Sequence, residues 1–190
     1  MTSAAASTEG YARAQIRGRG RLGPERKANR TVTGGGSSIP EVQRLLTVLA
    51  AGKRCAELGT AYGEGAAAIA STAASLVTVE RDPDRSALAR ERLAGLDNVE
   101  LLAGDWRDLL PPRGPFELLF LDSGDWKEEP YRQQALDLVE PGGLLLKDDM
   151  TPEFLEPDPV REWFFGHPHL LASEILTTPE TAAIIAARRA

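Results

Sequence analysis

Acidic side chains follow two buried, strand-like runs in the second half of the chain. Asp122 follows the apolar run 118–121, and Asp148 and Asp149 follow the run 143–147. Because ligands bind beyond the carboxyl ends of parallel strands, we expect these three carboxylates to converge at one rim. Like charges so close cost free energy unless a cation or protons intervene, and hard oxygen ligands suit Mg²⁺ or Ca²⁺. The alternative is that they are solvated strand ends or helix caps.

A lysine close to Asp122 could take part in catalysis beside these carboxylates. Lys127 is a candidate catalytic base, since a nearby cation disfavours a second positive charge and lowers the pKa of a lysine. An exposed surface lysine is the alternative. Asp125 is a rival metal ligand.

A glycine-rich turn, 57–65, separates a predicted strand from an alanine-rich predicted helix. Its glycines let a ligand approach the backbone and allow dihedral angles that other residues avoid. The order GxxxGxG differs from the GxGxxG of dinucleotide-binding folds and predicts a wider loop. Two alternatives stay open: the glycines only shape a tight turn, and Glu57 binds loop amides rather than a ligand.

An acid at the end of the next predicted strand complements this turn. Glu80 occupies that position, where a carboxylate can accept hydrogen bonds from ribose hydroxyls. Gly104, Asp105 and Trp106 follow the third predicted strand and are well placed to border an adenine. Together these residues indicate an adenosine site.

Short apolar runs alternate with helical stretches from Ile39 onward, which is typical of an α/β fold. The predicted parallel strands cover 54–58, 76–80, 99–103, 117–122 and 143–147. Predicted helices cover 40–51, 66–74, 82–95, 130–139 and 158–166. The last two apolar runs, 172–176 and 182–187, predict an antiparallel hairpin.

Composition supports one globular domain. The chain has 190 residues, of which 42% are hydrophobic and 26% charged, and such composition argues against a mainly disordered chain. We find neither an apolar run long enough to span a membrane nor a signal-peptide core, so we expect a cytoplasmic protein. The lone Cys55 excludes an intramolecular disulfide.

Charge is divided unevenly along the chain. Residues 1–30 carry seven basic and two acidic side chains, which gives +5 and leaves −11 for the remainder of a total of −6. We expect 1–30 to be a basic, flexible tail and 31–190 to be the catalytic domain. An acidic body is a poor platform for duplex nucleic acid, although the tail could still touch phosphates.

The glycine turn, Glu80 and the C-terminal hairpin resemble those of Rossmann-like, class I S-adenosylmethionine-dependent methyltransferases. The first motif of that family is [DE]xGxxxGxG, and the acid at the end of its second strand binds ribose. The resemblance covers about 38–190 and implies a seven-stranded, mostly parallel sheet with a C-terminal antiparallel hairpin and helices on both faces. It implies S-adenosylmethionine contacts from Glu57, Gly59, Thr60, Tyr62, Gly63, Gly65, Glu80, Arg81, Gly104, Asp105, Trp106 and Asp122.

The aspartates narrow the resemblance to the metal-dependent group that resembles catechol O-methyltransferase. That group places one aspartate after strand four and an Asp-Asn or Asp-Asp pair after strand five, around a divalent ion; Asp122, Asp148 and Asp149 match those positions. Some members carry a Trp-Lys pair with the lysine as base, which Trp126 and Lys127 resemble, although here the pair is further from the aspartate. The chain is also shorter than the family on its N-terminal side.

We therefore predict an S-adenosylmethionine-dependent O-methyltransferase that acts on a small phenol-like or catechol-like acceptor with the help of Mg²⁺ or another divalent cation. Asp122 and Lys127 are the predicted catalytic residues, and Asp122, Asp148 and Asp149 the predicted metal ligands. The alternatives are a metal-independent small-molecule methyltransferase, a non-catalytic adenosine-binding module, and a nucleic-acid methyltransferase guided by the basic tail. We expect no membrane or nucleic-acid partner and keep a homodimer open.

Overall fold

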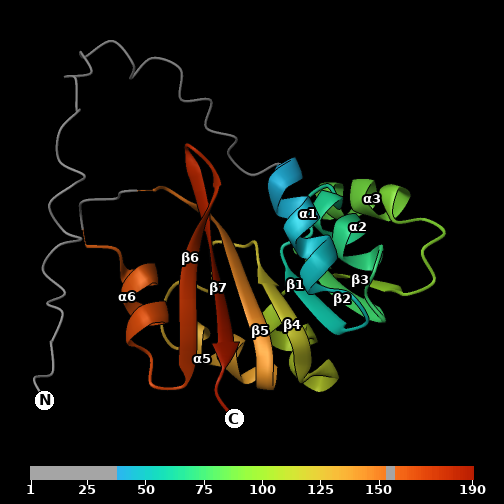
Figure 1. Ribbon diagram of the computed structural model, residues 1–190. Coiled ribbons are helices and arrows are strands. Elements are labelled where there is room, and N and C mark those ends of the chain that lie inside the picture. Colours follow the sequence, from blue (N-terminus) through green and yellow to red (C-terminus); the bar gives the residue numbers. More distant parts are fainter. Residues whose placement is uncertain (1–37, 153–156) are drawn as a thin grey trace, which may run out of the picture. The chain divides into compact units, whose positions relative to one another are not determined.

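A seven-stranded sheet organises the chain in the computed structural model, which describes residues 38–152 and 157–190 (Figure 1). The predicted basic tail, 1–30, lies outside the described residues. The strands are β1 Arg54–Leu58, β2 Ser75–Glu80, β3 Val99–Ala103, β4 Phe116–Leu121, β5 Val139–Met150, β6 Leu170–Thr178 and β7 Thr181–Arg188. The helices are α1 Pro40–Leu49, α2 Glu64–Ala70, α3 Pro83–Arg92, α4 Trp106–Leu109, α5 Tyr131–Asp137 and α6 Pro159–Gly166, with a 3-10 turn η3 at Pro111–Arg113.

The strand order is β3-β2-β1-β4-β5-β7-β6. The first five strands of this order are parallel, while β7 pairs antiparallel with both β5 and β6. This confirms the predicted Rossmann-like sheet with its C-terminal hairpin. The chain runs outward from β1 to β3 and then returns to β4, which lies beside β1. Ligands of open α/β sheets bind at such a reversal, beyond the carboxyl ends of the strands.

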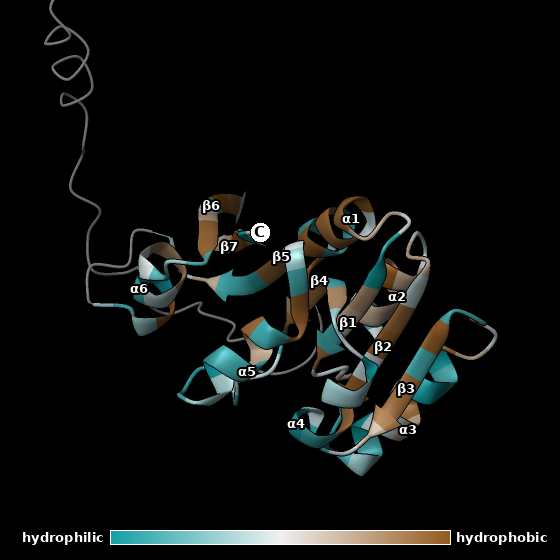
Figure 2. Cartoon of the chain, turned by 90° about the horizontal axis from the view of Figure 1, so that it is seen from below, coloured by the Kyte–Doolittle hydropathy of each residue, from teal (hydrophilic) through white to brown (hydrophobic). Residues whose placement is uncertain are grey.

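Helices cover both faces of the sheet, as predicted. The side chains of α1 and α2 form one apolar cluster against β1 and β4, and those of α4, α5 and α6 form a second cluster on the opposite face. Figure 2 shows that apolar residues concentrate in the strands, while α3 and α4 are largely polar. Burial of the sheet therefore drives this arrangement, because apolar strand faces must be removed from water.

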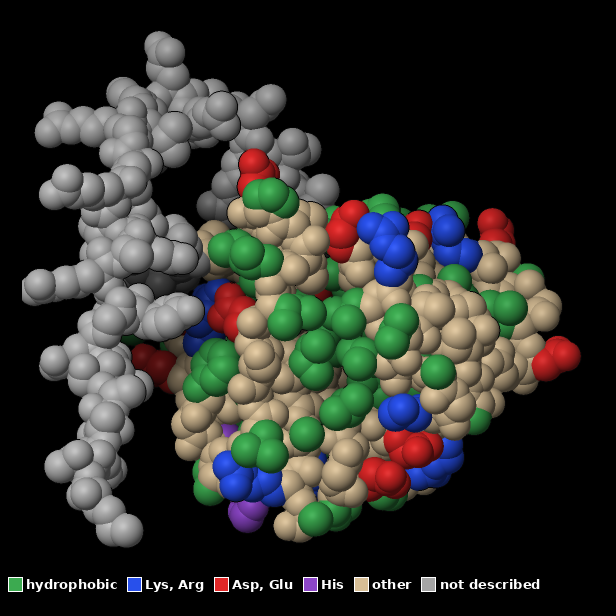
Figure 3. Space-filling view, viewed as in Figure 1, with side chains coloured by type: hydrophobic (Ala, Val, Ile, Leu, Met, Phe, Trp, Pro, Cys, Tyr) green, Lys and Arg blue, Asp and Glu red, His purple; other side chains and the backbone are tan. Residues whose placement is uncertain are grey.

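The apolar face beside α1 is only partly covered. Figure 3 shows apolar side chains gathered between the C-terminal hairpin and α1 on the face of the sheet seen in Figure 1. Leu171 on β6 is 56% exposed, and Ile175 and Ile185 are partly buried against the cluster below. The homodimer stays a prediction. None of the described helices is long and apolar enough to cross a membrane.

Local sequence signals set two helix starts. The carboxylate of Asp82 accepts hydrogen bonds from the amides of Asp84 and Arg85 at the start of α3, and Pro83 occupies the first helical position. Asp158 caps α6 in the same way, with Pro159 following it. Both starts agree with the prediction, because a capping carboxylate satisfies amides that have no partner inside the helix.

Other boundaries differ from the prediction. Helix α2 covers Glu64–Ala70 rather than 66–74, because Gly63 takes the left-handed conformation at its N-cap (φ 88°). Strand β5 is much longer than 143–147 and continues to Met150. Helix α4 was not predicted; it begins where Asp105 accepts a hydrogen bond from the amide of Arg107.

Candidate functional site

The turn between β1 and α2 lies directly beside the loop that follows β4. The amide of Asp122 donates to the carbonyl of Leu58 (3.1 Å), and the amides of Gly59 and Thr60 donate to Val79 (3.0 and 3.1 Å). Gly59 has φ 92°, and a Cβ there would lie 3.2 Å from the carbonyl oxygen of Asp122. A glycine is therefore required both by conformation and by the close approach of the two loops.

Gly65 at the start of α2 is required by packing. A Cβ on this residue would lie 2.5 Å from Oε1 of Glu57 and 3.1 Å from Oγ of Ser38. Glu57 thus lies beneath the first turn of α2, and its carboxylate occupies the space that a side chain would need. The oxygens Glu57 Oε1 and Ser38 Oγ are buried and have no hydrogen-bond partner among the described residues.

Glu57 is fully buried and forms part of a hydroxyl network. The hydroxyl of Thr78, its neighbour in register on β2, donates to Oε2 of Glu57 (2.5 Å), and the hydroxyls of Thr60 and Thr78 are 2.6 Å apart. Burial raises the pKa of Glu57 to about 8, with smaller contributions from the negative charges of Asp148 and Glu80, while the Thr78 hydrogen bond opposes the rise. Among the described contacts, Glu57 accepts from Thr78 and from no loop amide.

Glu80 is the carboxylate that holds the loop amides. Its Oε2 accepts a hydrogen bond from the amide of Ala61 (2.8 Å), and its Oε1 accepts one from the amide of Asp82 (2.9 Å). Ala61 has φ 48°, a left-handed conformation that is uncommon for alanine. Glu80 therefore fixes the glycine turn from the end of β2 and is itself held in one orientation.

The residues after β3 make more contacts within the protein than the sequence suggested. Trp106 is 3% exposed, and its indole nitrogen donates to Asp125 (3.1 Å). Asp105 caps α4 and pairs with Arg107, whose hydrogen bond holds the pKa of Asp105 below its usual value. Gly104 lies next to the end of β2, where its amide donates to the carbonyl of Glu80 (2.9 Å). These residues border the glycine turn with little of the indole ring available.

Two predicted cofactor residues lie at the surface. Arg81 is largely exposed and pairs with Asp125 at 3.6 Å. Tyr62 in the glycine turn is 36% exposed, and the guanidinium of Arg85 lies 5.9 Å from the centre of its ring. Asp125 therefore pairs with Arg81 and accepts hydrogen bonds from Trp106 and Ser123. It is not part of the group of three aspartates described next.

The structure brings Asp122, Asp148 and Asp149 together, and we call them the carboxylate cluster. One oxygen from each lies within 4.8 Å of the other two. Asp148 and Asp149 are adjacent on β5, where a regular strand would direct them to opposite faces. The pairing of β5 with β7 shifts register between Lys147 and Met150, and Asp149 has φ 56°. This irregularity lets both carboxylates reach Asp122.

Burial and neighbouring charges raise the pKa values of two acids of the carboxylate cluster, Asp122 and Asp148. The pKa of Asp122 is raised to about 9, chiefly by burial and then by the negative charge of Asp148. The pKa of Asp148 is also raised, mainly by burial. Ligand oxygens on one ion are separated by at most about 4 Å for Mg²⁺ and about 5 Å for Ca²⁺, given metal–oxygen distances near 2.1 and 2.5 Å. The charge and the donor type of the cluster therefore fit a divalent cation, and its spacing of up to 4.8 Å fits Ca²⁺ directly, whereas Mg²⁺ would require the carboxylates to move slightly closer together.

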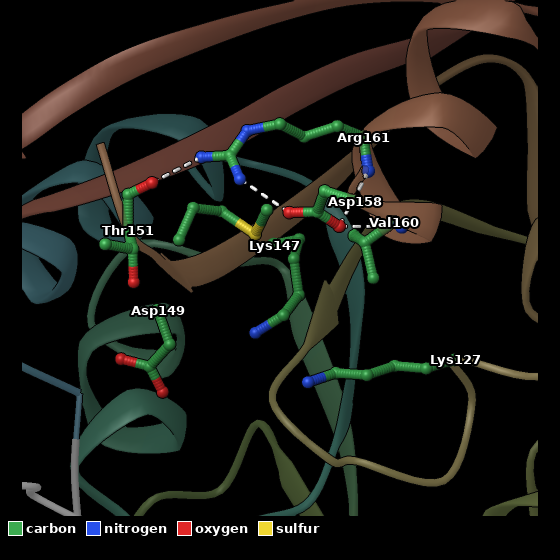
Figure 4. A pocket seen from close by; sticks show the side chains of 8 residues that line it. Lys127, Lys147, Asp149, Thr151, Asp158, Val160 and Arg161 are labelled. Carbon is green, nitrogen blue, oxygen red and sulfur yellow. Dashed lines mark hydrogen bonds and ion pairs between the residues drawn. The ribbon is translucent and has the colours of Figure 1, made fainter. Parts of the chain in front are cut away.

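A pocket of about 150 Å³ opens beside the cluster, and Figure 4 shows the side chains that line it. Lys127 and Lys147 both extend into it, together with Asp149. Burial lowers the pKa of Lys127, and the positive charge of Lys147 lowers it further. Trp126, the neighbour of Lys127, is fully buried and packs against Phe164 of α6, so it anchors the loop rather than lining the pocket.

Lys147 is a candidate functional residue of the pocket that was not predicted from the sequence. Its side chain is buried, and its ammonium lies 3.5 Å from Oδ1 of Asp148. The only signal was a lysine that closes the apolar run of β5 immediately before the aspartate pair. A lysine at a strand end is usually exposed, so burial could not be inferred from its type.

Comparison with known proteins identifies the family. Residues 56–150, half of the chain, match the methyltransferase domain family. A protein-L-isoaspartate O-methyltransferase of Methanoculleus marisnigri is 37% identical over 95 residues, which cover 49% of this chain and 42% of that protein. A catechol O-methyltransferase of Niastella koreensis is 33% identical over 118 residues, which cover 56% of this chain and 53% of that protein. The chain thus spans about half the length of these curated relatives.

A solved structure extends the similarity to most of the fold. Cofactor-bound Rv0187 from MTB has 26% sequence identity and a TM-score of 0.68, and the match covers 80% of this chain and 81% of that one. The family match runs from β1 through the glycine turn to the end of β5 and contains the carboxylate cluster. The chain belongs to the methyltransferase domain family, as a class I S-adenosylmethionine-dependent methyltransferase, and it is similar both to catechol O-methyltransferases and to protein-L-isoaspartate O-methyltransferases.

Proposed function

We propose that this protein transfers the methyl group of S-adenosylmethionine to an oxygen of a small phenol-like or catechol-like acceptor, with a divalent cation bound by the carboxylate cluster. The observation that carries the proposal is the contact between the glycine turn and the loop after β4. The amide of Asp122 lies 3.1 Å from the carbonyl of Leu58, so the proposed donor site and the cluster share one rim.

The proposed cofactor contacts follow from the geometry of the turn. Each oxygen of Glu80 accepts one amide hydrogen bond and retains capacity for another, which suits ribose hydroxyls. The unpartnered oxygens of Glu57 and Ser38 lie beneath the first turn of α2, where bound ligand groups or water would satisfy them. The proposed set otherwise equals the sequence-based one: Gly59, Thr60, Tyr62, Gly63, Gly65, Arg81, Gly104, Asp105, Trp106 and Asp122.

The chemistry is an in-line displacement. The bond between methyl and sulfur breaks as the bond between methyl and acceptor oxygen forms, and the sulfur keeps the electron pair, so the protein mainly aligns the reacting atoms. Lys127 is the proposed base, with the acceptor proton passing to its Nζ. Its lowered pKa favours the neutral amine that this step needs.

Asp122, Asp148 and Asp149 would hold the cation through carboxylate oxygens. When bound, the ion would stabilise the acceptor oxyanion, whose parent phenol has a pKa of about 10 in water. The protein supplies the rest: it gathers three carboxylates whose charges repel one another, with Asp148 buried, Asp122 partly buried and Asp149 exposed. Asp122 also connects the cluster to the glycine turn.

The test is metal dependence of methyl transfer to a catechol, with an isoaspartyl peptide as a second acceptor because relatives of both kinds match the chain. Complete chelation should abolish transfer to the catechol, and Mg²⁺ should restore it. Asp148→Asn should impair the Mg²⁺-supported rate more than the affinity for S-adenosylhomocysteine. Asp108→Asn is the matched control, since Asp108 is an exposed aspartate on α4.

Each rival function predicts a different outcome of this experiment. A metal-independent methyltransferase would keep its full rate after chelation. A non-catalytic adenosine-binding module would bind S-adenosylhomocysteine without transferring methyl groups to any phenol. A nucleic-acid enzyme would lose its substrate affinity when residues 1–30 are deleted, whereas the proposed enzyme would keep its activity on catechol.

A further inference from the structure

We propose that Lys147 binds a carboxylate of the acceptor, so that the preferred substrates are hydroxylated aromatic acids. This inference rests on the proposed function and names its substrate class. It starts from a buried ammonium in the pocket that the methyl-transfer chemistry does not use. Burying a charge is costly unless it is well paired, so such a group calls for a partner.

The pairing of Lys147 within the protein is incomplete. An ammonium has three N–H donors, and Lys147 has one hydrogen-bond partner among the described residues, Oδ1 of Asp148 at 3.5 Å. That distance is long for a charge-assisted hydrogen bond, which is usually below 3 Å. Yet the side chain is only 5% exposed. Donors are therefore left for a ligand that enters the pocket.

The other cations of the pocket are already committed. Arg161 donates to both carboxylate oxygens of Glu174 (2.8 and 2.6 Å), to Asp158 (2.5 Å) and to the carbonyl of Thr151 (2.8 Å). Lys127 is the proposed base and must be neutral to accept a proton. Lys147 is thus the pocket-lining cation that remains for an anionic substituent.

The acidic side chains of the pocket do not exclude an anionic substituent, because their charges are compensated. Asp158 is held by Arg161 and by the first amides of α6, so its charge is compensated. Asp149 belongs to the carboxylate cluster, whose charge the proposed cation balances. Figure 4 shows Asp149 on one side of the pocket and the Asp158–Arg161 pair on the other, with Lys147 between them.

The pocket has room for one aromatic ring. Its volume is about 150 Å³, and an enclosed cavity of that volume is enough to hold benzene. Hydroxyls at the carboxylate cluster and a carboxylate at Lys147 would then fix a single ring at two points. Two-point attachment sets which hydroxyl meets the methyl group, and this would make Lys147 a specificity-determining residue.

Binding measurements test the proposal separately from catalysis. Benzoate and benzamide have nearly the same shape and differ in charge, so we would titrate each into the full chain with S-adenosylhomocysteine and Mg²⁺. The wild type should bind benzoate about 10- to 100-fold more tightly, as expected for a charge-assisted hydrogen bond. Lys147→Met should abolish that preference and Lys147→Arg should keep it. Lys53→Met, outside the pocket, is the control.

Turnover completes the test. The ratio of kcat/KM for 3,4-dihydroxybenzoate over 3,4-dihydroxybenzamide should fall toward 1 in Lys147→Met. Equal binding of benzoate and benzamide by the wild type would overturn the proposal even if no variant folds, and so would a preference that survives in folded Lys147→Met. Benzoate preference that depends on Lys147, without methyl transfer to any phenol, would support the anion site and refute the proposed function instead.

Discussion

Glu57 should make the protein less stable as the pH rises toward 8, and Glu57→Gln should remove that loss. The carboxyl is fully buried, and its pKa is raised to about 8 from an ordinary 4.5. The folded protein therefore holds the proton more tightly than the unfolded chain does. Stability is fully present below the unfolded pKa and is lost as pH rises through the folded one.

The magnitude follows from the two pKa values. Between pH 6 and pH 8 the linkage relation gives a loss of about 2 kcal/mol, within a total of about 5 kcal/mol over the whole window. Glutamine can accept the hydrogen bond from Thr78 and cannot ionise, so this component should disappear in Glu57→Gln. The raised pKa values of Asp122 and Asp148 act in the same direction in both proteins.

Urea unfolding at several pH values from 6 to 8 measures the effect. The free energy of unfolding of Glu57→Gln, measured relative to that of the wild type, should rise by about 2 kcal/mol over this range. Glu91→Gln, at an exposed position on α3, should follow the wild type. Parallel curves for wild type and Glu57→Gln would refute the reasoning, because they would mean that Glu57 does not titrate there.

Three further predictions concern the glycine turn and the proposed base. Glu80→Ala should weaken binding of S-adenosylhomocysteine at least 10-fold by calorimetry, as two amide contacts and the ribose acceptor are lost; unchanged affinity would remove Glu80 from the site. Gly65→Ala should cost about 1 to 3 kcal/mol in urea unfolding, whereas Gly166→Ala, with open space around it, should be neutral; similar losses would contradict the packing argument. Lys127→Met should lower kcat about 10²- to 10⁴-fold. The wild-type rate should rise with pH until Lys127 is neutral, at a pH below the ordinary lysine pKa of 10.5. A pH-independent rate would exclude Lys127 as the base.

The fold could be predicted from the sequence because each element carries a local signal. Apolar runs marked the buried strands, and Asp82 with Pro83 marked the start of α3. Helix α4 escaped prediction because it is four residues long and too short for a periodic apolar pattern. The length of β5 was underestimated because Pro141 and Gly142 interrupt the apolar run near its start.

The sequence predicted which residues form the candidate site better than it predicted the contacts between them. The rule that ligand sites lie at carboxyl strand ends was enough to group Asp122, Asp148 and Asp149. The different partners of Glu57 and Glu80 were not predictable, because they depend on strand register. Glu57 on β1 lies opposite Thr78 on the neighbouring strand β2, while Glu80 at the end of β2 accepts from the loop amides. Sequence spacing does not reveal which of two acids meets which partner.

The irregularity at Asp149 explains both the cluster and the missed lysine. In a regular strand Lys147 and Asp149 would share one face and Asp148 would occupy the other. The register shift and the left-handed Asp149 break this alternation, so that Asp148 joins Asp149 at the cluster, while Lys147 and Asp149 both line the pocket. A non-glycine residue in this conformation costs free energy that the surrounding structure must offset. Glycine or asparagine would adopt it more easily, but glycine would remove the carboxylate and asparagine its charge. An aspartate tolerates the left-handed backbone and also adds a third carboxylate to the cluster, which is the arrangement that the proposed cation site would use.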